Sequence, residues 1–165
     1  LEAGGQVYAD AQYNIGVLCS EGRGVGQDYQ KALEWWLKAA EQDYADAQYN
    51  IGVLYDEGLG VRQDYGKALE WWLKSAEQSD AAYFNIGSLY ASGLGVKQDY
   101  RKALEWWLKA AEQNDAGAQY SIGVLYEHGL GVSPDSRKAL EWYQRAAGNG
   151  DTRAIGKVME LQEGQ

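Results

Sequence analysis

The chain has 165 residues, of which 45% are hydrophobic and 24% charged, a composition typical of a folded globular protein. Twenty-four acidic residues against fifteen basic ones give a formal net charge of −9, which argues against nucleic acid and anionic membrane surfaces as partners. Apolar stretches are too short for a transmembrane helix, and one cysteine with one histidine excludes an intramolecular disulfide framework and argues against a Cys/His metal site.

The sequence consists of four copies of one unit. The string KALEW begins at residues 31, 67, 102 and 138, which are 36, 35 and 36 residues apart. The dipeptide Ile-Gly begins at residues 15, 51, 86 and 122, so a second marker keeps the same phase. A period of this length is typical of solenoids and other repeat arrays.

Each unit is predicted to form two helices. In the first copy, apolar and small residues recur with helical periodicity over Ala11–Glu21. Gly22 then suits the left-handed residue that ends a helix. The second helix is expected to begin after Asp28, a residue type that caps helix N-termini, and to run to about Gln42. No segment shows the alternation of a strand, so the pattern predicts an all-α fold.

Two recurring features predict how these helices pack. A glycine inside each first helix costs about 0.5–1 kcal/mol relative to alanine, so we expect a close crossing against a bulky Trp or Tyr. These glycines are Gly16, Gly52, Gly87 and Gly123. Each second helix carries a glutamate four residues before a basic residue, an order that favours an ion pair worth about 0.2–0.5 kcal/mol. The pairs are Glu34/Lys38, Glu70/Lys74, Glu105/Lys109 and Glu141/Arg145.

The two ends of the chain differ from the middle. Val7–Asp10 matches Asp43–Asp46, the tail of a preceding unit, so the chain is expected to start inside an array. Asp151–Gln162 looks like a fifth first helix with Met159 in place of the glycine. Such a helix serves as a terminal cap if its outer face is charged. The residues expected on that outer face are Lys157, Glu160 and Glu163.

The repeated unit A-x-x-x-I-G-x-L-Y-x-x-G-x-G-V-x-x-D-x-x-K-A-L-x-W-x-x-x-A-A resembles the Sel-one-like repeat (SLR) family, a relative of the tetratricopeptide repeats, over essentially the whole chain. The resemblance implies an all-α, right-handed α-solenoid of antiparallel helix pairs, a TPR-like superhelix. It also implies a non-enzymatic protein–protein interaction role, as adaptor or scaffold, with no shared catalytic residues. Cysteine-rich members carry a Cys pair in each repeat, whereas this chain has only Cys19, so an oxidising compartment is not implied.

The copies can be compared within one molecule, as repeats of a single domain spanning residues 1–165. The expected repeats are 9–44, 45–79, 80–115 and 116–149, followed by a capping helix at 150–165. Positions that vary between copies are free to specify a partner, and the resemblance places the first helices on the concave face. The predicted partner-binding residues are Asn14, Val17, Glu21, Asn50, Val53, Asp56, Glu57, Asn85, Ser88, Ser121, Val124, Glu127 and His128.

Two groups on this face suggest the chemistry of a partner. The asparagine row (Asn14, Asn50, Asn85) suits a bound peptide backbone, because an amide both donates and accepts hydrogen bonds. The acidic residues Asp56, Glu57 and Glu127 favour a basic protein or peptide. The alternative is an ordinary acidic, solvated surface.

The tandem aromatics of the second helices are interpreted as core rather than as a sugar-stacking platform, because of their helical spacing. An exposed column of Trp36, Trp72 and Trp107 would form a second binding surface. His128 is expected to be exposed in the groove, and Cys19 to fill a tyrosine position as a small hydrophobic residue.

Sequence motifs for nucleophilic catalysis, phosphate binding or metal binding are missing, so no enzyme activity, cofactor or metal is expected. One alternative is an inhibitor or immunity protein that blocks a toxin or hydrolase. A hydrolase of cell-wall or β-lactam substrates would need a nucleophile–base pair that the sequence does not offer. The near-identical second helices leave open an engineered consensus-type scaffold. We expect a soluble protein without a visible targeting segment, whose compartment and oligomeric state the sequence leaves open.

Overall fold

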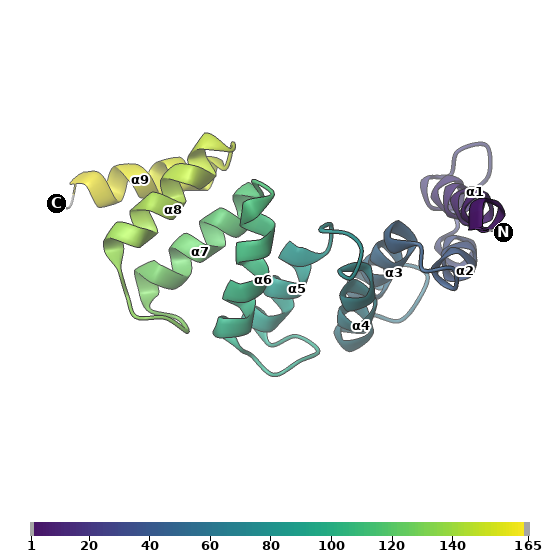
Figure 1. Cartoon of the computed structure of the whole chain (residues 1–165), viewed down its shortest axis with the longest axis horizontal. Helices are drawn as coiled ribbons and strands as arrows, with labels where there is room; N and C mark the ends of the chain where they lie inside the picture. Colours follow the sequence, from purple (N-terminus) through teal and green to yellow (C-terminus); the bar gives the residue numbers. More distant parts are fainter. Residues whose placement is uncertain (1, 164–165) are drawn as a thin grey trace. The chain divides into compact units, whose positions relative to one another are not determined.

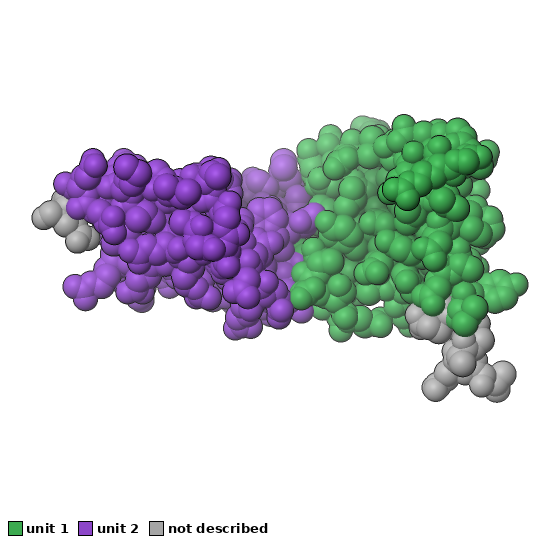
Figure 2. All heavy atoms as spheres, turned by 90° about the horizontal axis from the view of Figure 1, so that it is seen from above, with its two compact units in different colours: residues 1–82 green, residues 83–165 purple. Residues whose placement is uncertain are grey.

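The computed structural model describes residues 2–163, which form nine α-helices and no strand. Figure 1 shows these helices following one another in antiparallel pairs. The chain divides into two compact units, residues 1–82 and 83–165, coloured separately in Figure 2. Unit 1 contains α1 (Glu2–Glu21), α2 (Tyr29–Ala40), α3 (Ala45–Glu57) and α4 (Tyr65–Ser75). Unit 2 contains α5 (Tyr83–Ser92), α6 (Tyr100–Glu112), α7 (Ala116–His128), α8 (Ser136–Gly148) and α9 (Thr152–Glu163). The predicted all-α solenoid of helix pairs is confirmed.

The second helix of every repeat begins at the predicted aspartate cap. The Asp28 carboxylate accepts a hydrogen bond from the Lys31 backbone N–H at 3.0 Å, and this contact recurs in the other three repeats. Such a bond satisfies one of the four backbone donors that a helix leaves free at its start. The recurring caps are Asp28, Asp64, Asp99 and Asp135.

Glycines end the first helices and join neighbouring repeats. Gly58 closes α3 in the left-handed conformation, with φ of 70°. Gly60, two residues later, also has positive φ, and a Cβ there would lie 2.7 Å from Tyr29 Cβ and 2.8 Å from the Gln30 nitrogen. The second glycine of the turn therefore lets the backbone approach the start of α2 in the preceding repeat.

The core repeats the same positions in both units. Within each unit every helix packs on the next one along the chain. Ala32 and Trp36 of α2 are buried with Ala47, Ile51 and Leu54 of α3 in unit 1. The equivalent residues of unit 2 are Ala103, Trp107, Ala118, Ile122 and Leu125.

The glycines inside the first helices meet large aromatic side chains, as predicted. A Cβ on Gly52 would overlap the Trp72 indole, and one on Gly123 would lie 2.6 Å from Tyr143 Cε1. Gly16 and Gly87 face Trp36 and Trp107 in the same way. The indole N–H of Trp72 donates to the Tyr49 carbonyl at 3.1 Å, and Trp36 and Trp107 make the equivalent bond, so the three tryptophan crossings also satisfy the buried ring nitrogen.

The start of the chain differs from the prediction. The first helix begins before the predicted Ala11, because α1 runs without interruption from Glu2 to Glu21 and includes Val7–Asp10. Asp43 and its counterpart Asn114 break the helix through positive φ, of 57° and 62°. Val7 stands at that position in the first copy, and a β-branched residue disfavours this conformation, so the helix continues.

The ion pairs predicted along the second helices are also wrong. Among the described residues no ion pair joins these glutamates to the basic residue four positions later. Lys38 instead lies over the ring of Trp35, 4.2 Å from its centroid. Lys74, Lys109 and Arg145 lie over Trp71, Trp106 and Trp142 in the same way. A cation gains about 0.5–1 kcal/mol over an exposed aromatic face, which exceeds the gain from a solvated i,i+4 pair.

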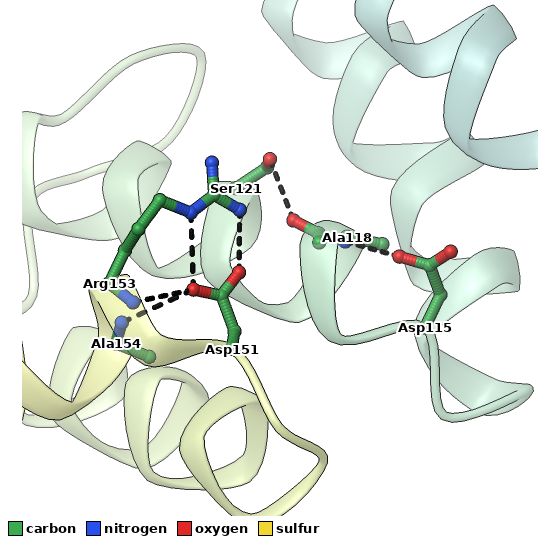
Figure 3. A network of polar contacts seen from close by, with 7 residues as sticks. Asp115, Ala118, Ser121, Asp151, Arg153 and Ala154 are labelled. Atoms are coloured by element: carbon green, nitrogen blue, oxygen red, sulfur yellow. Dashed lines mark hydrogen bonds and ion pairs between the residues drawn. The ribbon is translucent and has the colours of Figure 1, made fainter.

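Helix α9 is anchored at its N-terminus by Asp151. The Asp151 carboxylate accepts from the backbone N–H groups of Arg153 and Ala154 and pairs with the Arg153 guanidinium (Figure 3). These bonds, from the Arg153 side chain above all, hold the pKa of Asp151 below its usual value although burial opposes them. Asp115 caps α7 in the same way through the Ala118 N–H, at 2.7 Å.

Candidate protein-binding groove

A cavity of about 560 Å³ opens in unit 1 between the first helices of two consecutive repeats and the helix that separates them. Helix α1 provides Ser20 and Glu21, and α3 provides Asn50, Val53 and Leu54. The remaining lining residues come from the glycine turns and from α2: Arg23, Gln27, Tyr29, Trp36 and Leu59. We call this cavity the unit 1 groove.

The unit 1 groove brings together three of the predicted site residues, Glu21, Asn50 and Val53. Asn50 and Val53 are half-buried, and Glu21 is exposed. Burial raises the pKa of the Tyr13 hydroxyl, and a hydrogen bond from the Asn50 side chain opposes that rise, so this amide reaches back to α1. Asn14 and Val17 lie on α1 but do not line the cavity.

The glycine turn of the first repeat adds residues that the sequence analysis missed. Arg23 pairs with Glu21 at 2.7 Å between guanidinium and carboxylate. The Gln27 amide donates to the Ser20 carbonyl at 2.8 Å and to the Tyr29 hydroxyl at 3.0 Å, which holds the turn against α1. Arg23 was detectable in the sequence, because the other three copies have leucine at this position.

Two acidic residues stand side by side at the end of α3. Asp56 is half-buried and Glu57 is exposed, and neither belongs to an ion pair among the described residues. Burial, followed by the neighbouring charge of Glu57, raises the pKa of Asp56. Uncompensated negative charge at this point favours a positively charged ligand.

The predicted residues of unit 2 are partly committed to contacts within the unit. Ser88 donates to the Phe84 carbonyl at 2.9 Å, and Ser121 donates to the Gly117 carbonyl at 2.8 Å (Figure 3). Asn85 and Val124 are half-buried, and His128 is exposed. Both serine hydroxyls keep only their acceptor capacity for a ligand.

Glu127 joins three helices of unit 2. Its carboxylate accepts hydrogen bonds from the Tyr143 hydroxyl of α8 and from the Lys157 ammonium of α9, the latter at 2.9 Å. Lys157 is therefore half-buried against α7, and its predicted place on the outer face of the terminal helix is wrong. The reason is Tyr143, which replaces the tryptophan of the other repeats and brings a hydroxyl to this point.

This contact predicts a pH dependence of stability. Burial raises the pKa of Glu127, but the hydrogen bonds from Tyr143 and Lys157 outweigh burial and hold the pKa below its ordinary value of 4.5. A carboxyl whose pKa is lower in the folded state stabilises the protein above the unfolded value, and this contribution is lost as the pH falls through the folded value. We expect Glu127→Gln to cost about 2 kcal/mol at pH 7 and progressively less below pH 4.5.

Urea unfolding at a series of pH values measures this difference. Glu57→Gln, an exposed carboxylate on the corresponding helix of unit 1, is the control and should show a small effect at every pH. A Glu127→Gln penalty that stays constant from pH 7 to pH 3 would contradict the assignment.

The tryptophan column that is partly exposed is not the one that the sequence suggested. Trp36, Trp72 and Trp107 are only 4%, 2% and 7% exposed, so they form core and not a second binding surface. The partly exposed column consists of Trp35, Trp71, Trp106 and Trp142. Cys19 is buried with its thiol free, as expected for a small hydrophobic residue.

Comparison with known proteins identifies the repeat. The Sel1 repeat model matches residues 9–44, 45–80, 81–115 and 116–151. The chain belongs to the Sel1 repeat family. Members of this family are typically protein-interaction modules. No curated protein sequence matches the chain.

Solved structures of Sel1 repeat proteins agree with this assignment. A Sel1 repeat protein from Oxalobacter formigenes is 37% identical with a TM-score of 0.88, over 94% of this chain and 64% of that one. A protective antigen of uropathogenic Escherichia coli with an SLR fold is also 37% identical, with a TM-score of 0.91, over 94% of this chain and 34% of that one. Cysteine-rich protein B of Helicobacter pylori shares the fold at 24% identity and a TM-score of 0.59, over 79% and 94% of the two chains. The chain thus spans one to two thirds of the two more similar proteins.

None of the helices in the described part of the chain is both long and apolar enough to span a membrane. The same residues contain no group of three or more His, Cys, Asp or Glu side chains arranged to hold a metal ion.

Proposed function

We propose that this Sel1 repeat chain is a non-enzymatic interaction module, an adaptor or scaffold that binds a protein or peptide in the unit 1 groove. The observation that carries the proposal is the composition of the groove. Apolar Val53 and Leu59 line it together with the polar residues Glu21, Gln27 and Asn50. Such a mixture suits a peptide, whose backbone needs donors and acceptors and whose side chains need apolar contacts.

A basic partner fits the charges of this face best. The chain has a net charge of −9, and Asp56 with Glu57 adds uncompensated acidic groups to the end of α3. Complementary charge accelerates association and excludes acidic competitors. Asn14 and Val17 are further proposed binding positions of unit 1. In unit 2, taken by itself, the first-helix residues Asn85, Ser88, Ser121, Val124 and His128 form the proposed surface. Glu127 contributes to it less, because its carboxylate is already paired.

Charge reversal tests the proposal. We expect Asp56→Lys combined with Glu57→Lys to weaken binding of the partner at least about tenfold, because two favourable charges become repulsive. Affinity capture from lysate of the source cells, followed by mass spectrometry and titration of the captured protein, measures the loss.

The matched control carries Glu34→Lys with Glu70→Lys, an equal change of net charge on exposed positions of the second helices. Circular dichroism verifies that both double variants stay helical. A partner that binds wild type and the Asp56/Glu57 variant with equal affinity would refute the groove assignment.

A further inference from the structure

A second cavity of unit 1, of about 490 Å³, lies at the opposite end of the helices from the unit 1 groove. It is bounded by the C-terminal ends of α2 and α4 and by the first turns of α3. Gln48 of α3 forms part of its wall, so we call it the Gln48 pocket. The proposed function makes no use of this pocket.

Gln48 is a buried amide with an unused acceptor. The residue is 3% exposed, and its Oε1 has no hydrogen-bond partner among the described residues. The equivalent glutamines are satisfied: Gln12 Oε1 accepts from Gln42 at 2.7 Å, and Gln119 Oε1 accepts from Asn149 at 2.8 Å. A buried acceptor without a partner is rare, because it has lost its water and gained nothing in return.

Gln48 Oε1 lacks a partner in the described part of the chain because the residue at the donor position, Gln78, bonds elsewhere. Gln78 occupies the position of Gln42 and Asn149, but its amide donates to the Asp43 carbonyl at 3.1 Å. The repeat is one residue shorter just after Gln78, so the turn that follows differs from the equivalent turns of the other repeats. Gln48 Oε1 is therefore available to accept a hydrogen bond from a ligand in the pocket.

The other walls of the Gln48 pocket select a flat cation. Glu41, Asp43 and Glu77 contribute three carboxylates against the single ammonium of Lys74. Trp71 presents an aromatic face, and Lys74 lies over that ring at 4.3 Å from its centroid, so the ring already attracts a cation. Lys74 is exposed and free to move away from the ring when another cation enters.

We infer that the Gln48 pocket binds the guanidinium group of an arginine side chain on a protein partner. A guanidinium has five N–H donors in one plane, which allows one bond to Gln48 Oε1 and others to the carboxylates of Glu41 and Glu77. Its flat face stacks on Trp71 in place of the Lys74 ammonium. A lysine ammonium offers three donors and no plane, so it fills the same site less completely.

The test uses the full chain and three blocked tripeptides, acetyl-Gly-Arg-Gly-amide, its citrulline counterpart and its lysine counterpart. Citrulline keeps the shape of arginine but has no charge. Titration followed by ¹H–¹⁵N NMR reports on the Gln48 side-chain amide and the Trp71 indole N–H. We expect the arginine peptide to shift both signals and to bind about tenfold more tightly than either counterpart. Equal binding of the citrulline or lysine peptide would overturn the guanidinium assignment.

A pair of variants locates the site independently. Gln48→Leu removes the unused acceptor and should weaken the arginine peptide about tenfold while leaving the protein folded. Gln119→Leu is the matched control in unit 2, where the amide is already paired, and should leave peptide affinity unchanged. Affinity that is insensitive to Gln48→Leu, or shifts confined to other tryptophans, would refute the pocket as the binding site.

Discussion

Gly52→Ala is expected to destabilise the protein by about 2 kcal/mol, although alanine is the better helix former. The added Cβ would overlap the indole of Trp72, which is 2% exposed and is held by its hydrogen bond to the Tyr49 carbonyl. The ring has no free space to move into, so the helices must separate. The loss of packing therefore exceeds the gain of about 1 kcal/mol in helix propensity.

Gly156→Ala provides the control within the same chain. Gly156 lies inside α9, and a Cβ there meets nothing within 4 Å. This substitution should stabilise the protein by about 0.5–1 kcal/mol through propensity alone. Urea unfolding of both variants measures the two effects. If both substitutions changed the stability in the same direction, this would contradict the explanation that Gly52 is needed for the close crossing against Trp72.

Trp72→Ala is expected to cost about 3–5 kcal/mol, the range for removing a large buried aromatic side chain. The substitution empties the centre of the α3–α4 crossing and leaves the Tyr49 carbonyl without its indole donor. Trp71, the adjacent residue, is half-buried and lies under Lys74. Trp71→Ala should cost only about 1–2 kcal/mol, from partial burial and the lost cation contact.

The ratio of these two costs is the informative quantity. Urea unfolding monitored by far-UV circular dichroism gives both free energies without relying on tryptophan fluorescence, which the substitutions themselves change. A larger penalty for Trp71→Ala than for Trp72→Ala would mean that the two columns are exchanged and that the outer one forms the core.

Most of the fold could be predicted because each structural position occurs in four copies, which can be compared with one another. A glycine recurs at the position of Gly52, and a large aromatic residue recurs at the position of Trp72. Because each glycine lowers the stability of its helix, its recurrence in four copies indicated a close contact that offsets this loss. The aspartate caps and the glycine turns were equally predictable, because each acts through its own backbone neighbours. The tryptophan column was harder to assign, since two adjacent residues lie about 100° apart around the helix axis and both fall on its wide apolar face.

Features that depend on a single departure from the repeat were not predictable. Val7 in place of the helix-breaking aspartate lengthens α1, and Tyr143 in place of tryptophan draws Lys157 inward through Glu127. The unused acceptor of Gln48 follows from a shorter turn at the end of the next helix, α4. In each case the result depends on three-dimensional contacts between residues that sequence spacing does not bring together.

The candidate site was predicted only in outline. Variation between copies identified Glu21, Asn50 and Val53, which line the unit 1 groove. It missed Arg23 and Gln27, because the glycine turns were treated as connections and not as walls of a site. A residue such as Arg23, which occurs in one copy of the turn only, indicates a candidate binding position just as a variable residue on a helix face does.

Site-specific photo-crosslinking tests the central proposal most directly. A photoreactive phenylalanine analogue would replace Val53 inside the unit 1 groove or, as the control, Glu70 on the exposed face of α4. After irradiation in lysate of the source cells, we expect a discrete protein adduct at position 53 that a reversal of Asp56 and Glu57 abolishes, and none at position 70. A discrete adduct at position 70, with none at position 53, would contradict the proposal that this groove binds the partner.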